Sequence, residues 1–390
     1  MPCFDRVSLV MEIKLEQRQL FISIIEQQSA RDGINGRYFN ASRIDDNAGE
    51  GHFSLVFKAD DRSDGKPVAL KFFNPLETDE YRRRCFHRES DILKSLRGQP
   101  NIIQLIEPKE DCIIKLTHAP TGMEVPIPFE FISTDLAQSN IKRYIYETDT
   151  KPLKSLVYFR EMCKGVQRIH AKQICHRDLK PDNFFIIGRG DICLGDFGSS
   201  RCFGSSGQAL VEIYPVPHWR GELVYTAPEM FGLTTEDGES FRRADIYSLG
   251  ASLFEMFTKQ KLYPYVFDER FGIQIMEVTR YAVDNLPLAG ERLGQIVTQL
   301  VRDVRLPDIY DFDTDVPIVI RRILNSLYKG MASLDCKSRI CDFQVVFREI
   351  NRCIEILHDR AKYERWMELS RLWHERRRQR IAERQSKQSQ

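Results

Sequence analysis

Two short motifs constrain this chain more than any other feature of its sequence. Residues 176–183 read His-Arg-Asp-Leu-Lys-Pro-Asp-Asn, and residues 196–198 read Asp-Phe-Gly. Together they offer a carboxylate that can accept or orient a proton, oxygen ligands that suit Mg²⁺, and a cation that can neutralise developing charge. Transfer of a phosphoryl group requires each of these groups, and the residues that would supply them are Asp178, Lys180, Asn183 and Asp196. Eight contiguous positions followed by a second motif at a fitting distance make coincidence a negligible explanation.

A lysine at the end of an apolar run adds a second constraint. Residues 68–71 read Val-Ala-Leu-Lys, and a lysine in this position is costly to bury unless an anion meets it. In the helix that we predict over residues 80–96, Glu89 shares the apolar face with Ile92, so its carboxylate should point inward. We therefore predict an ion pair between Lys71 and Glu89. The alternative is a solvated glutamate among exposed arginines.

A glycine pair lies in a turn between two predicted strands. Residues 49–56 read Gly-Glu-Gly-His-Phe-Ser-Leu-Val, and glycines allow backbone N–H groups to approach phosphate oxygens without hindrance from a Cβ atom. Glycine pairs in hairpins are mostly turns, so this pattern is weak by itself. Read together with the motifs above, it predicts a phosphate-binding loop.

The pattern of apolar residues changes midway along the chain. From residue 37 to about residue 132, short β-branched and aromatic runs alternate with turn residues, and the helix over 80–96 interrupts them. After residue 136 the pattern is mostly helical, with helices expected over 153–171, 244–258, 291–304, 316–331 and 341–357. This order predicts an α+β fold with two lobes, a small β-rich N-lobe and a large helical C-lobe.

Composition excludes several classes of protein. Of the 390 residues 42% are hydrophobic and 29% charged, which is ordinary for a globular protein, and the formal net charge of +1 indicates neither a nucleic-acid nor a membrane partner. No apolar run approaches the length of a membrane span, and the first residues lack the layout of a secretion signal. The ten cysteines are scattered without a Cys-x-x-Cys pair, so we expect reduced thiols and a cytoplasmic location.

The motifs resemble those of the eukaryotic-type (Hanks-type) serine/threonine protein kinase family. The resemblance covers residues 37–355. Residues 227–229 (Ala-Pro-Glu) are similar to the motif that ends the family's activation segment. Residues 245–250 are similar to the family's helix whose aspartate holds the catalytic loop, here the loop that begins at His176. The run from Lys180 to Asn183 is typical of the serine/threonine branch. The resemblance implies a bilobal kinase fold, the cofactors ATP and Mg²⁺ (or Mn²⁺), and a protein substrate phosphorylated on serine or threonine.

The resemblance also implies a role for each motif residue. Asp178 would orient the acceptor hydroxyl or take its proton, and Lys180 would neutralise the γ-phosphate. Asn183 and Asp196 would bind Mg²⁺. The residues implied to bind ATP are Ala48, Gly49, Glu50, Gly51, His52, Phe53, Ser54, Leu55, Val56, Ala69, Lys71, Glu89, Glu130, Ile132 and Phe185. The residues implied to be structural or regulatory are Arg177, Glu229, Asp245 and Arg339, with Arg339 as the buried partner of Glu229.

Within the ATP-binding set, residues 129–132 (Phe-Glu-Phe-Ile) are similar to the family's hinge, whose backbone reads adenine. Phe129 would then be a bulky gatekeeper. Val56 and Ala69 would lie above the adenine and Phe185 below it.

In this family, the arginine at the position of Arg177 commonly contacts a phosphate group on the activation segment, the stretch between the Asp-Phe-Gly and Ala-Pro-Glu motifs. We therefore predict regulation by autophosphorylation, with Ser199, Ser200, Ser205 and Ser206 as candidate acceptors. The alternative is that these are ordinary loop serines. Glu222 stands where the family usually has a threonine, which puts the docking of the acceptor in question.

Three other functions remain as alternatives. A non-catalytic scaffold of this family typically loses the base, a metal ligand or the strand lysine, all of which are present here. A small-molecule kinase of the aminoglycoside type shares the catalytic motifs but lacks the Ala-Pro-Glu segment. Nucleic-acid binding rests only on the C-terminal tail.

The predicted boundaries are a helical extension over 1–36, a catalytic domain over 37–355 (N-lobe about 37–132, C-lobe about 136–355), and a basic helical tail over 356–390. In the tail, Trp366, Leu369 and Trp373 share one helix face, and several arginines follow. We expect the tryptophans to cap the large lobe and the arginines to be solvated. Docking of the tail to a partner or an acidic surface is the alternative.

Overall fold

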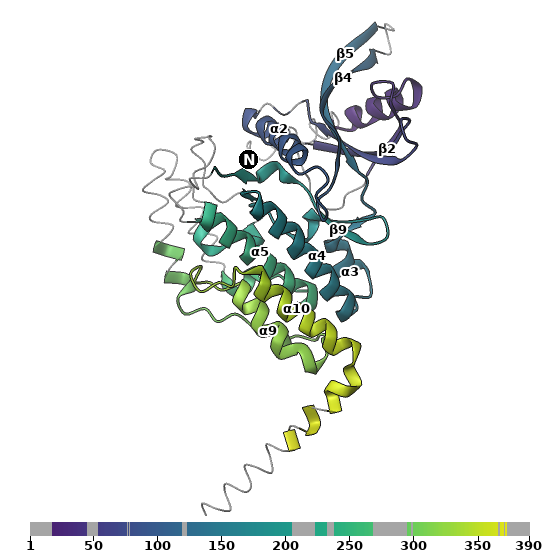
Figure 1. Ribbon diagram of the computed structural model, residues 1–390. Helices are drawn as coiled ribbons and strands as arrows, with labels where there is room; N and C mark the ends of the chain where they lie inside the picture. The colour runs from purple at the N-terminus through teal and green to yellow at the C-terminus, as the bar shows by residue number, and fades with distance from the viewer. Residues whose placement is uncertain are drawn as a thin grey trace, which may run out of the picture. The chain divides into compact units, whose positions relative to one another are not determined.

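The computed structural model describes residues 18–44, 54–75, 77, 79–118, 123–204, 223–231, 238–267, 295–297, 299–365, 367–369 and 371–372 (Figure 1). The chain divides into two compact units. The first comprises Met1–Ile141 together with Asp182–Ser200, and the second comprises Lys142–Pro181 together with Arg201–Gln390. The first unit is therefore discontinuous, because the chain leaves it at Ile141 and returns at Asp182.

An antiparallel sheet of five strands organises the first unit. In spatial order β1-β2-β3-β5-β4, its strands are β1 (Tyr38–Arg43), β2 (Ser54–Asp61), β3 (Pro67–Phe73), β5 (Met123–Asp135) and β4 (Leu105–His118). A smaller sheet in the order β6-β8-β9 contains β6 (Ser139–Asn140), β8 (Phe184–Ile187) and β9 (Asp191–Leu194). The predicted strand-rich first part of the chain is confirmed, and its last strand continues beyond residue 132.

Helix α2 (Glu80–Ser95) follows β3, as the sequence predicts for residues 80–96. It begins where the Asp79 side chain accepts a hydrogen bond from the backbone N–H of Tyr81 at 2.9 Å, which satisfies one of the free donors of the first turn. Its buried face includes Phe86, Glu89 and Ile92. The carboxylate of Glu89 therefore points into the unit.

The second unit is mostly helical. Its helices are α3 (Ile141–Glu147, beginning at the unit boundary), α4 (Pro152–Ala171), α5 (Gly238–Thr258), α6 (Tyr263–Val266), α9 (Ile318–Met331) and α10 (Phe343–His358). Helix α5 is buried almost all round; α4 and α9 pack on it, and α10 packs on α4 and α9 (Figure 1). Four of the five predicted C-lobe helices are present: α4, α9 and α10 lie within two residues of their expected bounds, and α5 begins six residues before residue 244. Of the fifth, residues 295–297 and 299–301 are helical, and residues 291–294 and 298 lie outside the described residues.

Short segments complete the second unit. Strand β7 (Ile174–Cys175) pairs with β10 (Arg201–Cys202), and single 3₁₀ turns cover Leu223–Tyr225, Pro228–Phe231 and Ile309–Asp311. The turn η1 (Pro181–Asn183) crosses the unit boundary, and η2 (Phe197–Ser199) lies in the first unit.

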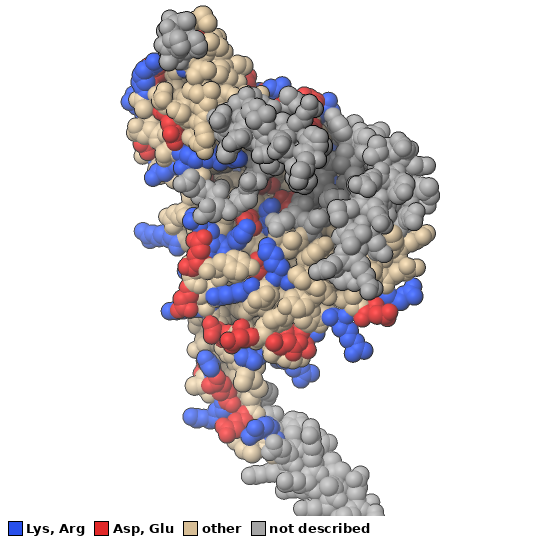
Figure 2. Space-filling model, turned by 180° about the vertical axis from the view of Figure 1, so that it is seen from behind, with Lys and Arg blue, Asp and Glu red and all other residues tan. Residues whose placement is uncertain are grey.

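Charged side chains do not separate by sign on the face drawn in Figure 2, where blue and red residues are interspersed. This mixture agrees with the near-zero net charge, and the described residues on that face form no extended basic surface. None of the helices in the described ranges is both long and apolar enough to cross a membrane.

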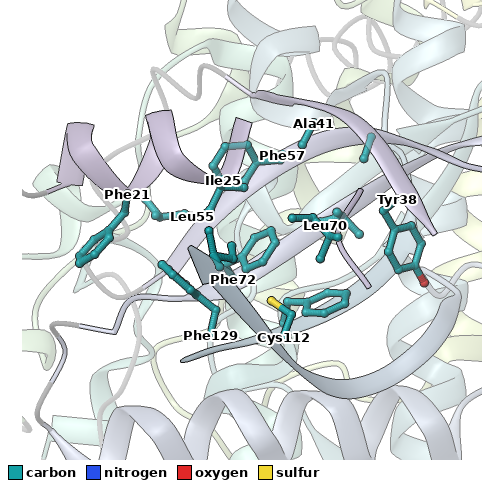
Figure 3. Packing of buried hydrophobic residues seen from close by; sticks show 14 of the residues in the cluster. Phe21, Ile25, Tyr38, Ala41, Leu55, Phe57, Leu70, Phe72, Cys112 and Phe129 are labelled. Carbon is teal, nitrogen blue, oxygen red and sulfur yellow. The ribbon is translucent and has the colours of Figure 1, made fainter. Parts of the chain in front are cut away.

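The N-terminal helix (residues 18–31) covers one face of the large sheet. Phe21, Ile24 and Ile25 are buried against it (Figure 3), and the ring of Phe21 meets that of Phe129 edge to face at 5.6 Å. The predicted helical extension is thus helical, but it shares the apolar core of the first unit. Residues 1–17 lie outside the described residues.

The tail beyond α10 continues as helix over 360–365 and 367–369. Leu369 is 61% exposed, so this residue does not pack on the unit in the way that the capping interpretation requires. Trp366, Trp373 and the arginines from Arg376 onward lie outside the described residues.

Candidate active site

Lys71 is the centre of a buried ionic contact in the first unit. Its Nζ donates to Oε2 of Glu89 at 2.7 Å and to Oδ1 of Asp196 at 3.0 Å. The Lys71 side chain is 17% exposed and that of Glu89 only 6%. The predicted pair of Lys71 and Glu89 is present, and the alternative of a solvated Glu89 is wrong. The structure adds Asp196, the first residue of the Asp-Phe-Gly motif, as a second anionic partner.

Burial and charge act in opposite directions on this contact. Burial lowers the pKa of Lys71, but the two neighbouring carboxylates outweigh it, so the pKa is raised and the ammonium group stays charged. Burial raises the pKa of Glu89, while the charge of Lys71 opposes that rise. Lys71 and Glu89 therefore depend on each other to remain ionised inside the unit.

The hairpin of β8 and β9 places the two predicted metal ligands side by side. Phe184 lies opposite Leu194 in the ladder, so Asn183 and Asp196 flank the same end of the hairpin. The backbone carbonyl of Asn183 accepts from the N–H of Gly195 at 3.0 Å. Thirteen positions apart in sequence, the two residues meet because the turn between the strands is short.

The backbone is strained at Asp196 itself. Asp196 has φ of 59°, a left-handed conformation that costs a non-glycine residue about 1–2 kcal/mol. An added Cβ atom at Gly195 would lie 2.8 Å from the ring of Phe185, so glycine is needed for that ring to approach. Phe185 therefore lies directly against the segment that carries Asp196.

The face of the sheet that carries Lys71 is defined by register. Residues directly opposite each other in an antiparallel pair share a face, and Lys71 lies opposite Val56 on β2 and Ile132 on β5. Ala69, two residues before Lys71, lies opposite Thr134. Val56 and Ala69, both predicted to contact adenine, are thus neighbours of Lys71 on this face.

The predicted hinge at residues 129–132 is wrong in position. Phe131 and Ile132 lie opposite β3, and Phe129 and Glu130 lie opposite β4. All four residues are therefore inside the sheet, where backbone N–H and C=O groups form hydrogen bonds with the neighbouring strands. The side chain of Glu130 bonds to Nε2 of His87 on α2 at 2.6 Å. Neither Glu130 nor Ile132 is placed for its backbone to read a nucleotide base.

Phe129, the predicted gatekeeper, and Leu55, a predicted ATP-binding residue, lie on the face of the sheet away from Lys71. Both side chains belong to the core beneath the N-terminal helix (Figure 3). Successive residues of a strand point to opposite faces. Val56 therefore faces Lys71 and Leu55 faces away from it. Ala48, Gly49, Glu50, Gly51, His52 and Phe53 lie outside the described residues.

The end of β5 lies beyond the predicted hinge, at Asp135. Thr134 stands on the Lys71 face one residue before the strand ends at Asp135. Leu136 and Ala137 then belong to no strand or helix, and among the described residues their backbone groups form no hydrogen bond with another backbone group. The sequence does not mark this later end of β5, because the polar run Ser133-Thr134-Asp135, which belongs to the strand, resembles a loop.

The catalytic loop of the second unit is held by a buried aspartate. Oδ2 of Asp245 accepts from the backbone N–H of His176 at 2.8 Å, and Oδ1 accepts from that of Arg177 at 2.9 Å. His170 Nε2 also contacts Oδ2, at 2.9 Å. Arg177 has φ of 70°, so the carboxylate stabilises a turn that this residue does not favour by itself. The expected role of Asp245 as the holder of this loop matches these contacts.

Asp178 and Lys180 follow directly within this loop. Oδ2 of Asp178 and Nζ of Lys180 are 3.6 Å apart, and both side chains are largely buried. The guanidinium group of Arg177 lies 4.5 Å from the centre of the Phe241 ring. The loop thus presents a carboxylate and an ammonium group close together.

Arg339 and Glu229 form the predicted buried pair. Two parallel bonds join them, Nη1 to Oε1 at 2.5 Å and Nη2 to Oε2 at 3.0 Å, a geometry that favours arginine over lysine. Burial lowers the pKa of Arg339, but Glu229 more than compensates and the pKa is raised. The arginine also donates to the carbonyls of Ser333 and Arg243. It therefore ties three segments of the second unit together.

Sequence reasoning missed a second buried carboxylate. Glu255 on α5 is fully buried and accepts from the hydroxyl groups of Tyr146 and Tyr225, each at 2.7 Å. Lys261 Nζ lies 3.7 Å from the same carboxylate. Glu255 thereby fixes Tyr225, which stands two residues before the Ala-Pro-Glu motif. No local pattern marks this residue, because its partners come from three separate segments.

The two ligand residues of the first unit fit Mg²⁺ by the chemistry of their atoms. An amide and a carboxylate oxygen are hard donors, and Mg²⁺ is usually held by one or two protein oxygens together with phosphate and water. In the described part of the chain, no group of three or more His, Cys, Asp or Glu side chains could hold a metal alone. The pair therefore fits a metal that arrives with a nucleotide.

Comparison with known proteins agrees with this geometry. A family model described as the protein kinase domain matches residues 43–352. Cyclin-dependent kinase D-1 of Arabidopsis thaliana is 32% identical over 213 residues, which cover 54% of this chain and 48% of the relative. A probable serine/threonine-protein kinase CHK1 homolog of Encephalitozoon cuniculi is 30% identical over 233 residues, which cover 58% of this chain and 50% of the relative.

The chain spans about half the length of the curated relatives it matches. The family model, however, covers most of the chain, which confirms the predicted family and the α+β kinase fold. The chain belongs to the protein kinase domain family.

Proposed function

We propose that this chain is a serine/threonine protein kinase that transfers the γ-phosphoryl group of Mg-ATP to a hydroxyl group of a protein. The observation that carries the proposal is the three-way contact of Lys71, Glu89 and Asp196. It keeps a buried cation charged and places the carboxylate of Asp196, which would bind Mg²⁺, beside it, and phosphate oxygens require such a cation. A pair with only a structural role would not need the second carboxylate.

In the proposed reaction, the acceptor oxygen forms a bond to the γ-phosphorus while the bond from that phosphorus to the β–γ bridging oxygen breaks. ADP leaves with the bridging oxygen. The hydroxyl proton passes to the carboxylate of Asp178 and then to solvent. Lys180, close to that carboxylate, neutralises charge on the transferred group. Mg²⁺ held by Asn183 and Asp196 would screen the phosphate charges.

Adenine recognition is proposed for the segment Asp135–Ala137 in place of residues 129–132. Support comes from its position at the end of β5 and from the backbone groups of Leu136 and Ala137. Thr134 would then be the gatekeeper, and Val56, Ala69 and Phe185 would contact the base. Replacement of Thr134 by Phe should weaken ATP binding or change inhibitor selectivity, whereas Phe129→Leu should affect stability alone.

The first test is transfer of labelled γ-phosphate from ATP with Mg²⁺ to a mixed peptide library, comparing wild type with Asp178→Ala. Phosphoserine or phosphothreonine should form, and the variant should be slower by about 10²–10⁴-fold. Binding of Mg-ATP should be unchanged in the variant.

Other outcomes separate the alternatives. Mg-ATP binding with no transfer to peptides, sugars or antibiotics would indicate a scaffold. Transfer only to a sugar or antibiotic would indicate a small-molecule kinase. Either result would reject the proposed function.

Regulation by autophosphorylation is part of the proposal. Ser200 is fully buried, so its hydroxyl is not accessible in this conformation, whereas Ser199 is partly exposed. Ser205, Ser206 and Glu222 lie outside the described residues. Mapping of phosphopeptides from active enzyme should find phosphate between residues 199 and 206, and Arg177→Ala should remove the activation that follows it. Active enzyme without phosphate there would reject this regulation.

A reducing, cytoplasmic location is proposed from the cysteines. Nine cysteines lie in the described part of the chain, and none of these is joined to another by a disulfide bond. Burial, followed by the charges of Asp135 and Asp191, raises the pKa of Cys193 to about 12, so this thiol stays protonated and unreactive near neutral pH. Cell fractionation with a tagged chain would test the location.

A further inference from the structure

A cavity of about 480 Å³ lies between α9 and α10 of the second unit. Its apolar lining comes from both helices and the segment between them: Ile323, Leu327, Ile340 and Val345. Leu327 is fully buried, while the other three are partly exposed. The size lies within the range of small ligand-binding pockets, so the cavity can accept one or two apolar side chains.

Three arginines line the cavity together with one carboxylate. Arg322 comes from α9, and Arg348 and Arg352 come from successive turns of α10. The side chains of Arg348 and Arg352 are 68% and 63% exposed. Both contact Glu349, at 2.9 and 3.8 Å. Three cations against one anion leave a positive excess among the residues that line the apolar cavity.

The spacing of the arginines indicates the shape of the ligand. Residues four apart on a helix are separated by about 6 Å, and Arg322 stands on the other helix. Separated cations of this kind suit several carboxylates along an extended chain better than one compact phosphate group. Glu349, placed between two of them, would also repel a densely charged headgroup. An acidic peptide is therefore a better match than a phospholipid.

The chain's own C-terminal residues do not suit the cavity. The sequence from Arg376 to Arg384 is strongly basic, so it has the same sign of charge as the arginines. A partner with carboxylates and an apolar side chain is complementary in both respects.

We propose that this arginine cavity (Arg322, Arg348 and Arg352 around Ile323, Leu327, Ile340 and Val345) binds an acidic segment of a partner protein that inserts a leucine-like side chain. The site goes beyond the proposed kinase function. It lies wholly within the second unit, and binding there requires neither ATP nor transfer. The exposed arginines steer the acidic segment, and the apolar floor selects the inserted side chain.

The test uses the full chain and a fluorescein-labelled peptide of sequence Glu-Glu-Leu-Asp-Leu-Glu, with fluorescence anisotropy in low and in physiological salt. The double variant Arg348→Ala/Arg352→Ala should bind about tenfold more weakly, since each exposed contact contributes up to about fivefold. The charge-preserving variant Arg348→Lys/Arg352→Lys should recover part of the loss. Arg143→Ala on α3, another exposed arginine that pairs with a glutamate, should have no effect.

Two control ligands probe the two halves of the site. A peptide with both leucines replaced by serine should bind less well, as should a peptide with the acidic residues replaced by lysine. Equal affinity of wild type and the double alanine variant would overturn the proposal. So would arginine-dependent binding to vesicles of anionic phospholipid without binding to the peptide. Because the assay involves no catalysis, its result is independent of whether the kinase proposal holds.

Discussion

At the scale of single residues, the most consequential feature is that buried charges occur in groups. Lys71 meets two carboxylates, Arg339 meets Glu229 and two carbonyls, and Glu255 meets two tyrosines and a lysine. An ionised group inside a protein persists only where partners replace its water. Each group therefore stabilises the structure only while all its members are present. Removal of one member should lower the free energy of unfolding by more than the intact group contributes to it.

The Lys71 contact allows a test of that dependence. Lys71→Met leaves Glu89 buried without its cation and should lower the free energy of unfolding by about 3 kcal/mol. The double variant Lys71→Met/Glu89→Leu should recover most of this loss because no charge remains uncompensated. Phosphate transfer should be absent in both. Urea unfolding followed by fluorescence measures the difference, and equal stability of the single and double variants would contradict the explanation.

Asp61 makes a pH-dependent contribution to the free energy of unfolding. Arg37 donates two hydrogen bonds to its carboxylate, at 2.9 and 2.8 Å, and this pair lowers the pKa of the buried Asp61 to about 2. A lowered pKa means that the contribution is present above the ordinary value near 4 and is lost as pH falls towards 2. The contribution should be about 2 kcal/mol.

Asp61→Asn should therefore destabilise the chain at pH 6 and flatten the decline of stability between pH 4 and pH 2. The exposed Asp91 on α2 gives a matched control, since Asp91→Asn should leave the wild-type pH profile in place. Thermal unfolding at a series of pH values makes the comparison. A parallel decline in wild type and Asp61→Asn would exclude the assigned role.

At the scale of elements, the N-terminal helix and α2 cover opposite faces of the large sheet. Phe21 packs on Phe129 on one face, while His87 of α2 bonds to Glu130 on the other. The same strand, β5, thus supports the apolar core and the face with the ionic contact. Loss of the N-terminal helix should expose the apolar face of the sheet and weaken the whole unit.

Phe21→Ala should lower the free energy of unfolding by about 3–5 kcal/mol, the usual cost of removing a buried phenylalanine. Leu20, its neighbour in sequence, is 43% exposed, and Leu20→Ala should cost less than about 1 kcal/mol. Calorimetry on the full chain would compare them. If the two variants unfold at the same temperature, the helix does not stabilise the sheet as described.

The catalytic loop depends on α5 through Asp245. Asp245→Asn retains one acceptor oxygen but turns an N–H₂ group towards a backbone N–H, so the loop from His176 should lose its fixed conformation. Phosphate transfer should fall at least tenfold, while Mg-ATP binding should stay unchanged because Lys71, Glu89, Asn183 and Asp196 all belong to the first unit. Steady-state kinetics and nucleotide titration separate the two effects. An equal loss in both would indicate general unfolding.

At the scale of the whole molecule, the first unit is built from two separate stretches of sequence. Asn101 and Ile103 bond to the backbone of β9, so the returning hairpin is part of the fold as well as the carrier of Asp196. The unit can therefore be completed only after the chain has passed through Lys142–Pro181. Contacts of this kind are long-range and slow to form.

A fragment that ends at Ile141 should accordingly fail to bind Mg-ATP and unfold at a lower temperature than the full chain. It lacks β8, β9 and Asp196, which leaves Lys71 with one carboxylate partner of two. Circular dichroism and nucleotide titration would show this. A fragment that binds Mg-ATP with the affinity of the full chain would refute the view of the unit as discontinuous.

The sequence alone determined the chemistry of the site. The motifs at 176–183 and 196–198 are contiguous, and the pairing of Lys71 with Glu89 follows from helix periodicity and from the cost of an unpaired buried charge. The long helices α4, α9 and α10 were predictable within a few residues for a similar reason, since one apolar face at regular spacing is a local property.

Tertiary structure decided which face each strand residue takes and where β5 ends. The run from Ile127 to Ile132 carries apolar residues almost throughout, because a strand covered on both sides shows no alternation. Its register, and with it the true positions of Phe129 and Leu55, depends on which helix covers which face. The surroundings of Glu255 and the arginine cavity likewise arise from segments far apart in the chain. Such contacts leave no local pattern, and only the packing of the complete fold brings them together.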